Sequence, residues 1–143
     1  MMQQLMYAIG TNMDFSVPDV MWNSIYWLDE IPKGSRVVIY GAGRLGKAYY
    51  RQLTNDSQNR LTLSAWVDKN QAGKVICDHV VDHIDVIADN NYDYILIAVM
   101  DKSLAERIIS DICDKYRITR DQVIWLEQRE AFWDFAEYAG YLT

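Results

Sequence analysis

Short apolar runs alternate with amphipathic stretches along most of the chain. Runs rich in β-branched and other apolar residues predict strands at residues 37–40, 61–67, 94–99 and 123–126, with a shorter strand at 74–77. The run at 94–99 is apolar on both faces, as a central parallel strand must be. Apolar residues three and four apart predict helices at residues 19–28, 44–53, 82–88, 102–116 and 129–141. Asp101 or Ser103 can cap the helix at 102–116.

Strands that alternate with helices predict an α/β protein. We expect a three-layer Rossmann-like fold, with a mostly parallel sheet of about five strands and helices on both faces. Residues 1–143 are expected to form a single nucleotide-binding domain. Within it, residues 1–32 are a helical extension, 33–126 the core and 127–143 an aromatic helix. Ligands of such sheets bind at the carboxyl ends of the strands, near the switch point.

The strand at 37–40 leads directly into a G-x-G-x-x-G pattern, whose residues are Gly41, Ala42, Gly43, Arg44, Leu45 and Gly46. The first glycine allows a tight turn, the second lets the backbone approach a pyrophosphate, and the third lets helix and strand pack closely. Backbone N–H groups around Ala42 to Leu45, at the positive end of the helix dipole, would capture phosphate. Asp68 ends the next strand, where an acid binds ribose hydroxyls. A carboxylate there favours NAD over NADP because it repels a 2′-phosphate, although Arg44 can offset this by reaching a phosphate.

Three runs carry a resemblance to a known class of protein: VVIYGAGRLG at 37–46, AWVDKN at 65–70 and YDYILIAV at 92–99. They resemble the NAD(P)-binding Rossmann-like domains of bacterial nucleotide-sugar epimerases and dehydratases. Similar modules are appended to glycosyltransferases and methyltransferases of surface-polysaccharide synthesis. The resemblance covers residues 33–126. It implies a domain of sugar-nucleotide or polysaccharide metabolism, with NAD or NADP as cofactor and a dinucleotide or nucleotide-sugar as ligand.

The resemblance also implies roles for individual residues. Gly41, Gly43 and Gly46 would form the pyrophosphate loop, Asp68 would receive the adenosine ribose, and Ala98 and Val99 would flank the cofactor. The implied set of cofactor-binding neighbours is completed by Ala42, Arg44, Leu45 and Lys69.

Catalysis does not carry over with the resemblance. Epimerases and dehydrogenases of this kind use a Tyr-x-x-x-Lys acid/base pair, and no lysine here has a tyrosine four residues before it. A separate substrate domain also has no room. We therefore identify no catalytic residue, and whether the chain is an enzyme stays open. If it belongs to one, the resemblance implies an NAD-dependent epimerase or dehydratase.

Other functions compete for the same loop. Gly41, Gly46 and Lys47 nearly spell a phosphate-binding loop of NTPases, but Ala48 lacks the hydroxyl that would hold magnesium. An S-adenosylmethionine-binding methyltransferase-like domain is a rival, although such loops usually have an acid where this chain has Tyr40. The remaining alternative is a non-binding interaction or dimerisation domain, in which a side chain such as Tyr40 or Arg44 blocks the crevice.

The possible metal ligands, the net charge and the absence of targeting signals narrow the possible functions further. Cys77, His79 and His83 lie close together, but their spacing is not a standard zinc pattern, so no metal is expected. The net charge of −6 argues against a nucleic-acid partner. No apolar run is long enough to span a membrane, no signal peptide is recognised, and two cysteines make no disulfide framework, so a cytoplasmic location is expected. The aromatic stretch at 131–142 suggests a homodimer or partner-domain interface, or packing on the N-terminal helix.

Overall fold

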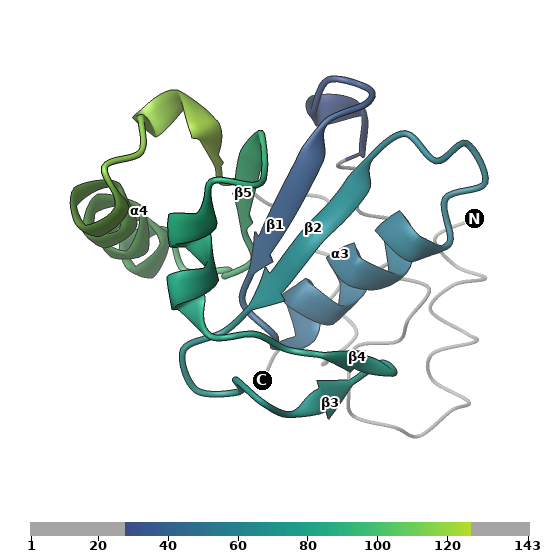
Figure 1. Ribbon diagram of the computed structural model, residues 1–143, viewed down its shortest axis with the longest axis horizontal. Helices are drawn as coiled ribbons and strands as arrows, with labels where there is room; N and C mark the ends of the chain where they lie inside the picture. The colour runs from purple at the N-terminus through teal and green to yellow at the C-terminus, as the bar shows by residue number, and fades with distance from the viewer. Residues whose placement is uncertain (1–27, 127–143) are drawn as a thin grey trace, which may run out of the picture. The chain divides into compact units, whose positions relative to one another are not determined.

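A parallel sheet places the ends of three strands at one edge, as the computed structural model of residues 28–126 shows (Figure 1). The strand order is β2-β1-β5-β6, with bounds β1 Arg36–Tyr40, β2 Thr62–Val67, β5 Tyr94–Ile97 and β6 Val123–Ile124. Tyr40 is in register with Val67 on one side and Ile97 on the other. The residues that follow, Gly41, Asp68 and Ala98, therefore meet at the same carboxyl edge.

Helices cover both faces of this sheet (Figure 1). Helix α3, Arg44–Thr54, covers one face, where the ring of Tyr50 stacks on the fully buried Trp66 with centroids 4.6 Å apart. Helix α4, Lys102–Tyr116, and the 3₁₀ helix η2, Ile84–Asp89, cover the other face. There Ile87 and Ile109 pack into one buried cluster with side chains of β1, β2 and β5. Two shorter 3₁₀ helices are η1 Leu28–Glu30 and η3 Arg120–Gln122.

The structure confirms the predicted Rossmann-like α/β fold and refines its elements. The main sheet of residues 28–126 has four strands rather than about five. The helix expected at 82–88 is the 3₁₀ helix η2, because Ile84 and Ile87 are three residues apart and a 3₁₀ helix has three residues per turn. Helix α4 is capped as expected, since the Asp101 carboxylate accepts a hydrogen bond from the Ser103 N–H at 3.2 Å.

The short strand expected at 74–77 belongs to a separate hairpin. Strands β3 Val75–Ile76 and β4 His79–Val80 pair antiparallel outside the main sheet. Cys77 and Asp78 between them both have positive φ, 52° and 62°, as the two central residues of a type I′ turn require. Neither residue is the Gly or Asn that usually indicates such a turn, so the sequence did not predict β4.

Several predictions fall on residues that the structure does not describe. The predicted helices at 19–28 and 129–141 lie outside residues 28–126, except that Leu28 begins η1. The aromatic stretch at 131–142 lies outside them as well. Within the described residues, no helix has the length and apolar character needed to cross a membrane.

Candidate functional site

Two of the three loop glycines are required by the protein's own packing. Gly41 has φ of +115°, and a Cβ there would lie 2.9 Å from the Ala98 carbonyl oxygen. A Cβ on Gly46 would overlap the Gly41 carbonyl oxygen. That oxygen also accepts a hydrogen bond of 2.8 Å from the indole Nε1 of Trp66. Strand β5, helix α3 and Trp66 thus hold the glycine loop in place from three sides.

Gly43 differs from the other two glycines. Its φ is −82°, which any L-residue can adopt, and a Cβ built on it would meet no atom within 4 Å. The fold of residues 28–126 therefore does not require glycine here. The space that a side chain at this position would fill lies directly at the start of α3.

The start of α3 is open and positive. Gly43 is its N-cap, no side chain caps it, and no acidic residue lies in its first turn. Arg44 is exposed and Lys47 half-buried, and neither forms an ion pair within residues 28–126. The first N–H groups of a helix have no partner inside the helix, and its dipole makes this end positive. This arrangement suits an anion.

Asp68 ties the loop to the segment that follows β2. One carboxylate oxygen accepts a hydrogen bond of 2.8 Å from the Ala42 N–H. The other accepts from the N–H groups of Asn70 and Gln71, at 2.7 and 2.8 Å. A carboxylate can accept about four hydrogen bonds, so Asp68 keeps room for a ligand hydroxyl. The Ala42 N–H is already used, which leaves the N–H groups of residues 43–46 for a phosphate.

Tyr40 does not block the loop. Its side chain is 9% exposed and belongs to the core on the α4 side of the sheet. Burial raises the pKa of its phenol, and the negative charges of Asp68 and Asp111 raise it further, against a lowering by Lys115. The Tyr40 ring lies in the same buried cluster as Ile109 and Ile112 of α4. Arg44, the other side chain considered as a block, is exposed.

The remaining predicted site residues lie at the same edge. Ala98 extends the ladder of β5, because its N–H donates to the Tyr40 carbonyl at 2.8 Å. The Val99 carbonyl accepts a hydrogen bond of 2.8 Å from the indole Nε1 of Trp125, a residue that sequence reasoning missed. Its place within the last predicted strand, residues 123–126, was the available clue. Lys69 follows Asp68 and is exposed.

The residues considered as metal ligands serve different structural roles. His79 packs against the rings of Tyr50 and Trp66, with centroids 5.3 and 6.0 Å away. The Nδ1 atom of His83 accepts a hydrogen bond from the Asp85 N–H and caps η2. Cys77 lies in the hairpin turn. Within residues 28–126 no group of three His, Cys, Asp or Glu side chains is placed to hold a metal ion.

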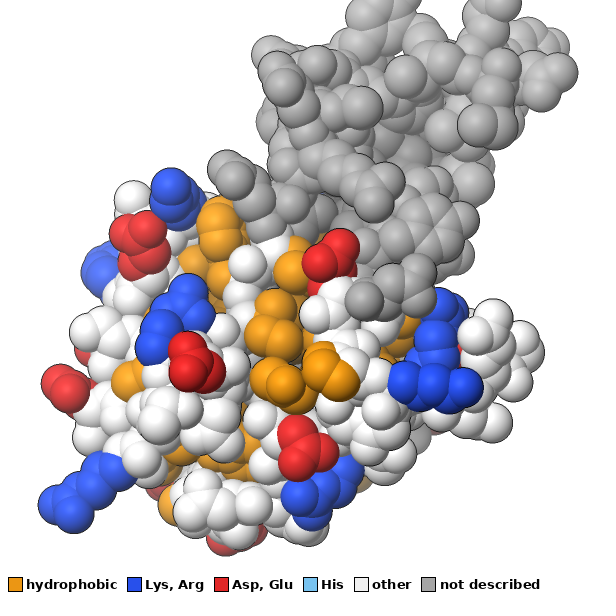
Figure 2. All heavy atoms as spheres, turned by 90° about the horizontal axis from the view of Figure 1, so that it is seen from above, with side chains coloured by type: hydrophobic (Ala, Val, Ile, Leu, Met, Phe, Trp, Pro, Cys, Tyr) orange, Lys and Arg blue, Asp and Glu red, His pale blue; other side chains and the backbone are white. Residues whose placement is uncertain are grey.

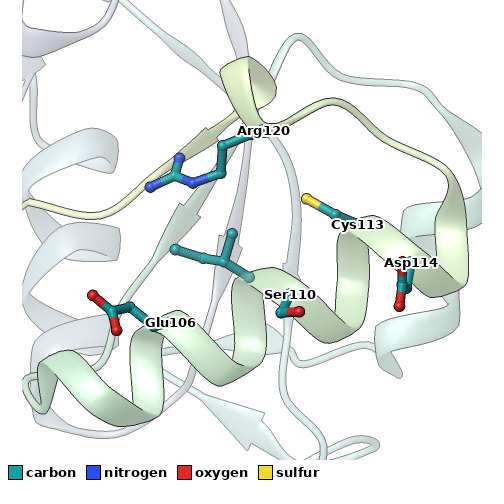
Figure 3. A pocket seen from close by; sticks show the side chains of 6 residues that line it. Glu106, Ser110, Cys113, Asp114 and Arg120 are labelled. Atoms are coloured by element: carbon teal, nitrogen blue, oxygen red, sulfur yellow. The ribbon is translucent and has the colours of Figure 1, made fainter.

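A shallow groove of about 370 Å³ lies elsewhere, between α4 and η3 (Figure 3). Arg120 from η3 reaches over the groove, and Glu106 and Cys113 from α4 flank it (Figure 3). The groove contains no residue of the glycine loop and no predicted site residue. It is therefore a surface distinct from the carboxyl edge.

Comparison with solved structures finds the same fold in Rex-family repressors. The crystal structure of RSP, a Rex-family repressor, has a TM-score of 0.51 and 22% identity, over 78% of this chain and 59% of that one. RSP in complex with β-NADH has a TM-score of 0.50 and 21% identity, over 72% and 57%. RSP with β-NAD⁺ and operator DNA has a TM-score of 0.49 and 21% identity, over 72% and 54%.

These comparisons support the Rossmann-like fold, but they do not support a particular function. The chain spans less than two thirds of the length of these repressors. No protein-family model and no curated protein matches the chain. None of the three structures is described as an epimerase or dehydratase, so that part of the sequence resemblance is not supported.

The expectation of no nucleic-acid partner is wrong, since RSP, whose crystal structure has a similar fold at a TM-score of 0.51, is a repressor that was also solved with operator DNA. Net charge sums over the whole chain, whereas DNA binding depends on a local basic face. The likeness also covers only part of the repressor chain, so the repressor's remaining residues have no counterpart in this comparison. On the face drawn in Figure 2, Lys and Arg side chains lie among Asp and Glu side chains rather than in one patch.

Proposed function

We propose that this chain is a dinucleotide-binding domain for an NAD-type ligand, built on residues 33–126 and without complete catalytic machinery of its own. The pyrophosphate would lie on the N–H groups of residues 43–46 at the start of α3. Asp68 would receive the adenosine ribose, with Lys69 beside it. Ala98 and Val99 would flank the ligand on the β5 side. We assign no reaction to this site.

Gly43 is the observation that carries the proposal. Gly41 and Gly46 are explained by contacts within the protein, but Gly43 is not, because its backbone is unstrained and its Cβ would meet open space. A ligand that approaches the backbone closely explains a glycine at such a position. The open helix start behind it supplies unpaired N–H groups and positive charge.

Asp68 supports an NAD-type ligand over one with a 2′-phosphate. The three N–H groups that bind its carboxylate fix its orientation at the carboxyl edge before any ligand arrives. A fixed carboxylate suits the two hydroxyls of an adenosine ribose and repels a phosphate ester on it. The repressor solved with β-NADH has the same fold and is consistent with this choice.

Titration calorimetry with the whole chain tests the proposal against its rivals. The ligands are NAD⁺, NADH, NADP⁺, S-adenosylmethionine and UDP-glucose, the last standing for the nucleotide-sugar function implied by the sequence resemblance. We expect heat with NAD⁺ or NADH and weaker binding of NADP⁺. Binding heat with UDP-glucose alone or S-adenosylmethionine alone would contradict an NAD-type ligand and assign that ligand instead. No binding heat with any ligand would favour a non-binding domain.

Two variants locate the binding. Asp68→Asn removes the charge at the ribose position. It should weaken the binding of NAD⁺ about tenfold and reduce the difference in affinity between NAD⁺ and NADP⁺. Asp89→Asn is the matched control, since Asp89 is an exposed carboxylate at the end of η2. Equal affinities for both variants would remove Asp68 from the site.

A further inference from the structure

Two helices begin at the carboxyl edge, and their first turns differ in chemistry. Helix α3 begins uncapped, with the cations Arg44 and Lys47 in its first turns. Helix α4 begins with Asp101, whose carboxylate caps the helix. Because Ala98 contacts Gly41, the segment that leads into α4 starts directly beside the glycine loop. The edge therefore has one half suited to phosphate and one half that is not.

The α4 half of the edge also exposes apolar surface. Within residues 28–126, four large apolar side chains are exposed, namely Val75, Val80, Met100 and Leu104. The first two belong to the β3–β4 hairpin, and the other two lie at the start of α4, 36% and 37% exposed. Ligand sites are lined mostly by apolar side chains, so Met100 and Leu104, which follow the segment that starts at Ala98, are candidates to contact a ligand at this edge.

The helical repeat shows which way Leu104 faces. At 100° per residue, Leu104 lies on the same stripe of α4 as Lys115, whose ammonium is 3.1 Å from Asp85 of η2. The opposite stripe holds Glu106 and Ser110, which line the groove beside η3. Leu104 therefore faces the η2 side of α4, toward the middle of the sheet, and not the groove.

We infer that the first turn of α4 selects the second half of the ligand, through apolar contact with Met100 and Leu104 and through the negative charge of Asp101. This inference rests on the proposed function, because it starts from a pyrophosphate bound at α3. The group accepted there is a flat, largely apolar ring without negative charge, such as a nicotinamide. A second phosphate or an acidic sugar is disfavoured.

Charge and burial at this half agree with that choice. The Asp101 carboxylate is exposed and uses one oxygen for the Ser103 N–H, so its charge acts on whatever lies at the edge. Lys102 is displaced by about 160° around the helix from the Leu104 stripe. Beneath the edge lies Tyr40, nine tenths buried, whose hydroxyl forms no hydrogen bond within residues 28–126. A neutral or cationic ring fits this environment better than an anion.

Three ligands that share the ADP-ribose part separate this inference from the proposed function. They are ADP-ribose, NAD⁺, and nicotinic acid adenine dinucleotide, which differs from NAD⁺ in carrying a carboxylate on the ring. By calorimetry with the whole chain, we expect NAD⁺ to bind about tenfold more tightly than ADP-ribose, because its ring buries apolar surface on Leu104. We expect the acid analogue to bind about threefold to fivefold more weakly than NAD⁺.

Variants assign each preference to its residue. Leu104→Ser should bring the affinity for NAD⁺ within about twofold of the affinity for ADP-ribose and leave the latter unchanged. The control Val80→Ser should change neither affinity. Asp101→Asn keeps a good N-cap and should remove the preference for NAD⁺ over the acid analogue. Asp114→Asn, in the groove on the other side of α4, is its control.

The outcomes are distinct. ADP-ribose binding with no gain for NAD⁺ overturns this inference and leaves the proposed function standing. An affinity for NAD⁺ that Leu104→Ser does not alter overturns it too. Failure of all three ligands to bind overturns the proposed function, and this inference with it.

Discussion

Replacing Gly43 by alanine separates the needs of the fold from those of the ligand. The added Cβ would meet nothing within 4 Å, and the backbone angles at this position suit alanine. Gly41→Ala and Gly46→Ala are matched comparisons within the same loop. A Cβ at Gly41 would press on the Ala98 carbonyl at a φ of +115°, and one at Gly46 would overlap the Gly41 carbonyl.

The expected magnitudes follow from these contacts. In Gly43→Ala, the loss of a glycine N-cap lowers the free energy of unfolding by about 0.5–1 kcal/mol. The reduced conformational freedom of the unfolded chain raises it by about 0.4–1 kcal/mol, so stability should hardly change. The methyl group would displace a phosphate from the N–H groups at the start of α3. Loss of one charge-assisted hydrogen bond costs about 2 kcal/mol, which is roughly thirtyfold in Kd. Gly41→Ala and Gly46→Ala should each lose about 3 kcal/mol or more of stability.

Urea denaturation measures the stabilities, and calorimetry with NAD⁺ measures the affinities. We expect Gly43→Ala to unfold like the parent chain and to bind NAD⁺ roughly thirtyfold more weakly. If Gly43→Ala binds NAD⁺ as tightly as the parent chain, no phosphate approaches this backbone and Gly43 is not part of the site. If Gly43→Ala unfolds as easily as Gly41→Ala, the glycine serves the fold and not a ligand.

Three further predictions concern stability. Trp66→Phe leaves the buried Gly41 carbonyl without its 2.8 Å indole partner and should cost about 1–3 kcal/mol in urea denaturation, so an unchanged midpoint would contradict that role. Hydrogen bonds from Arg60 lower the pKa of Asp56 from 3.8 to about 2, so its stabilising effect is complete above the unfolded pKa and is lost as pH falls from about 4 through 2. Acid titration of stability should show this loss, and Asp56→Asn should abolish it. Asp78→Gly relieves a φ of 62° and should raise stability by about 1 kcal/mol, with a higher Tm in calorimetry, whereas a lower Tm would show that the aspartate has another role.

Much of the fold follows from local pattern. The apolar run at 94–99 predicted the central strand, and the spacing of Ala105, Ile109 and Ile112 predicted the buried face of α4. The predicted cap at Asp101 is confirmed because Asn and Asp side chains reach a nearby N–H without help from the rest of the fold. The hairpin β3–β4 was only half predicted, since its turn uses Cys77 and Asp78 in a conformation that other residues normally adopt.

Contacts between distant residues could not be predicted from the pattern. The sequence places Trp66 on a strand and Gly41 in a turn, but their hydrogen bond depends on β1 and β2 pairing in parallel register. The same pairing brings Asp68 to the Ala42 N–H. Trp125 reaches the Val99 carbonyl because β6 lies beside β5 in the sheet.

The strand–glycine loop–helix unit follows from the sequence alone, since tight turns, helix starts and buried strands depend on neighbouring residues. The sequence also shows that an acid follows the second strand. The glycine pattern had already predicted a turn at Gly41, backbone access at Gly43 and close packing at Gly46; the tertiary structure added the atoms that a Cβ would meet at Gly41 and Gly46 and the open space at Gly43. Those atoms belong to Ala98, Trp66 and Gly41 itself, and Ala98 and Trp66 reach the loop only when β1 pairs with β5 and β2.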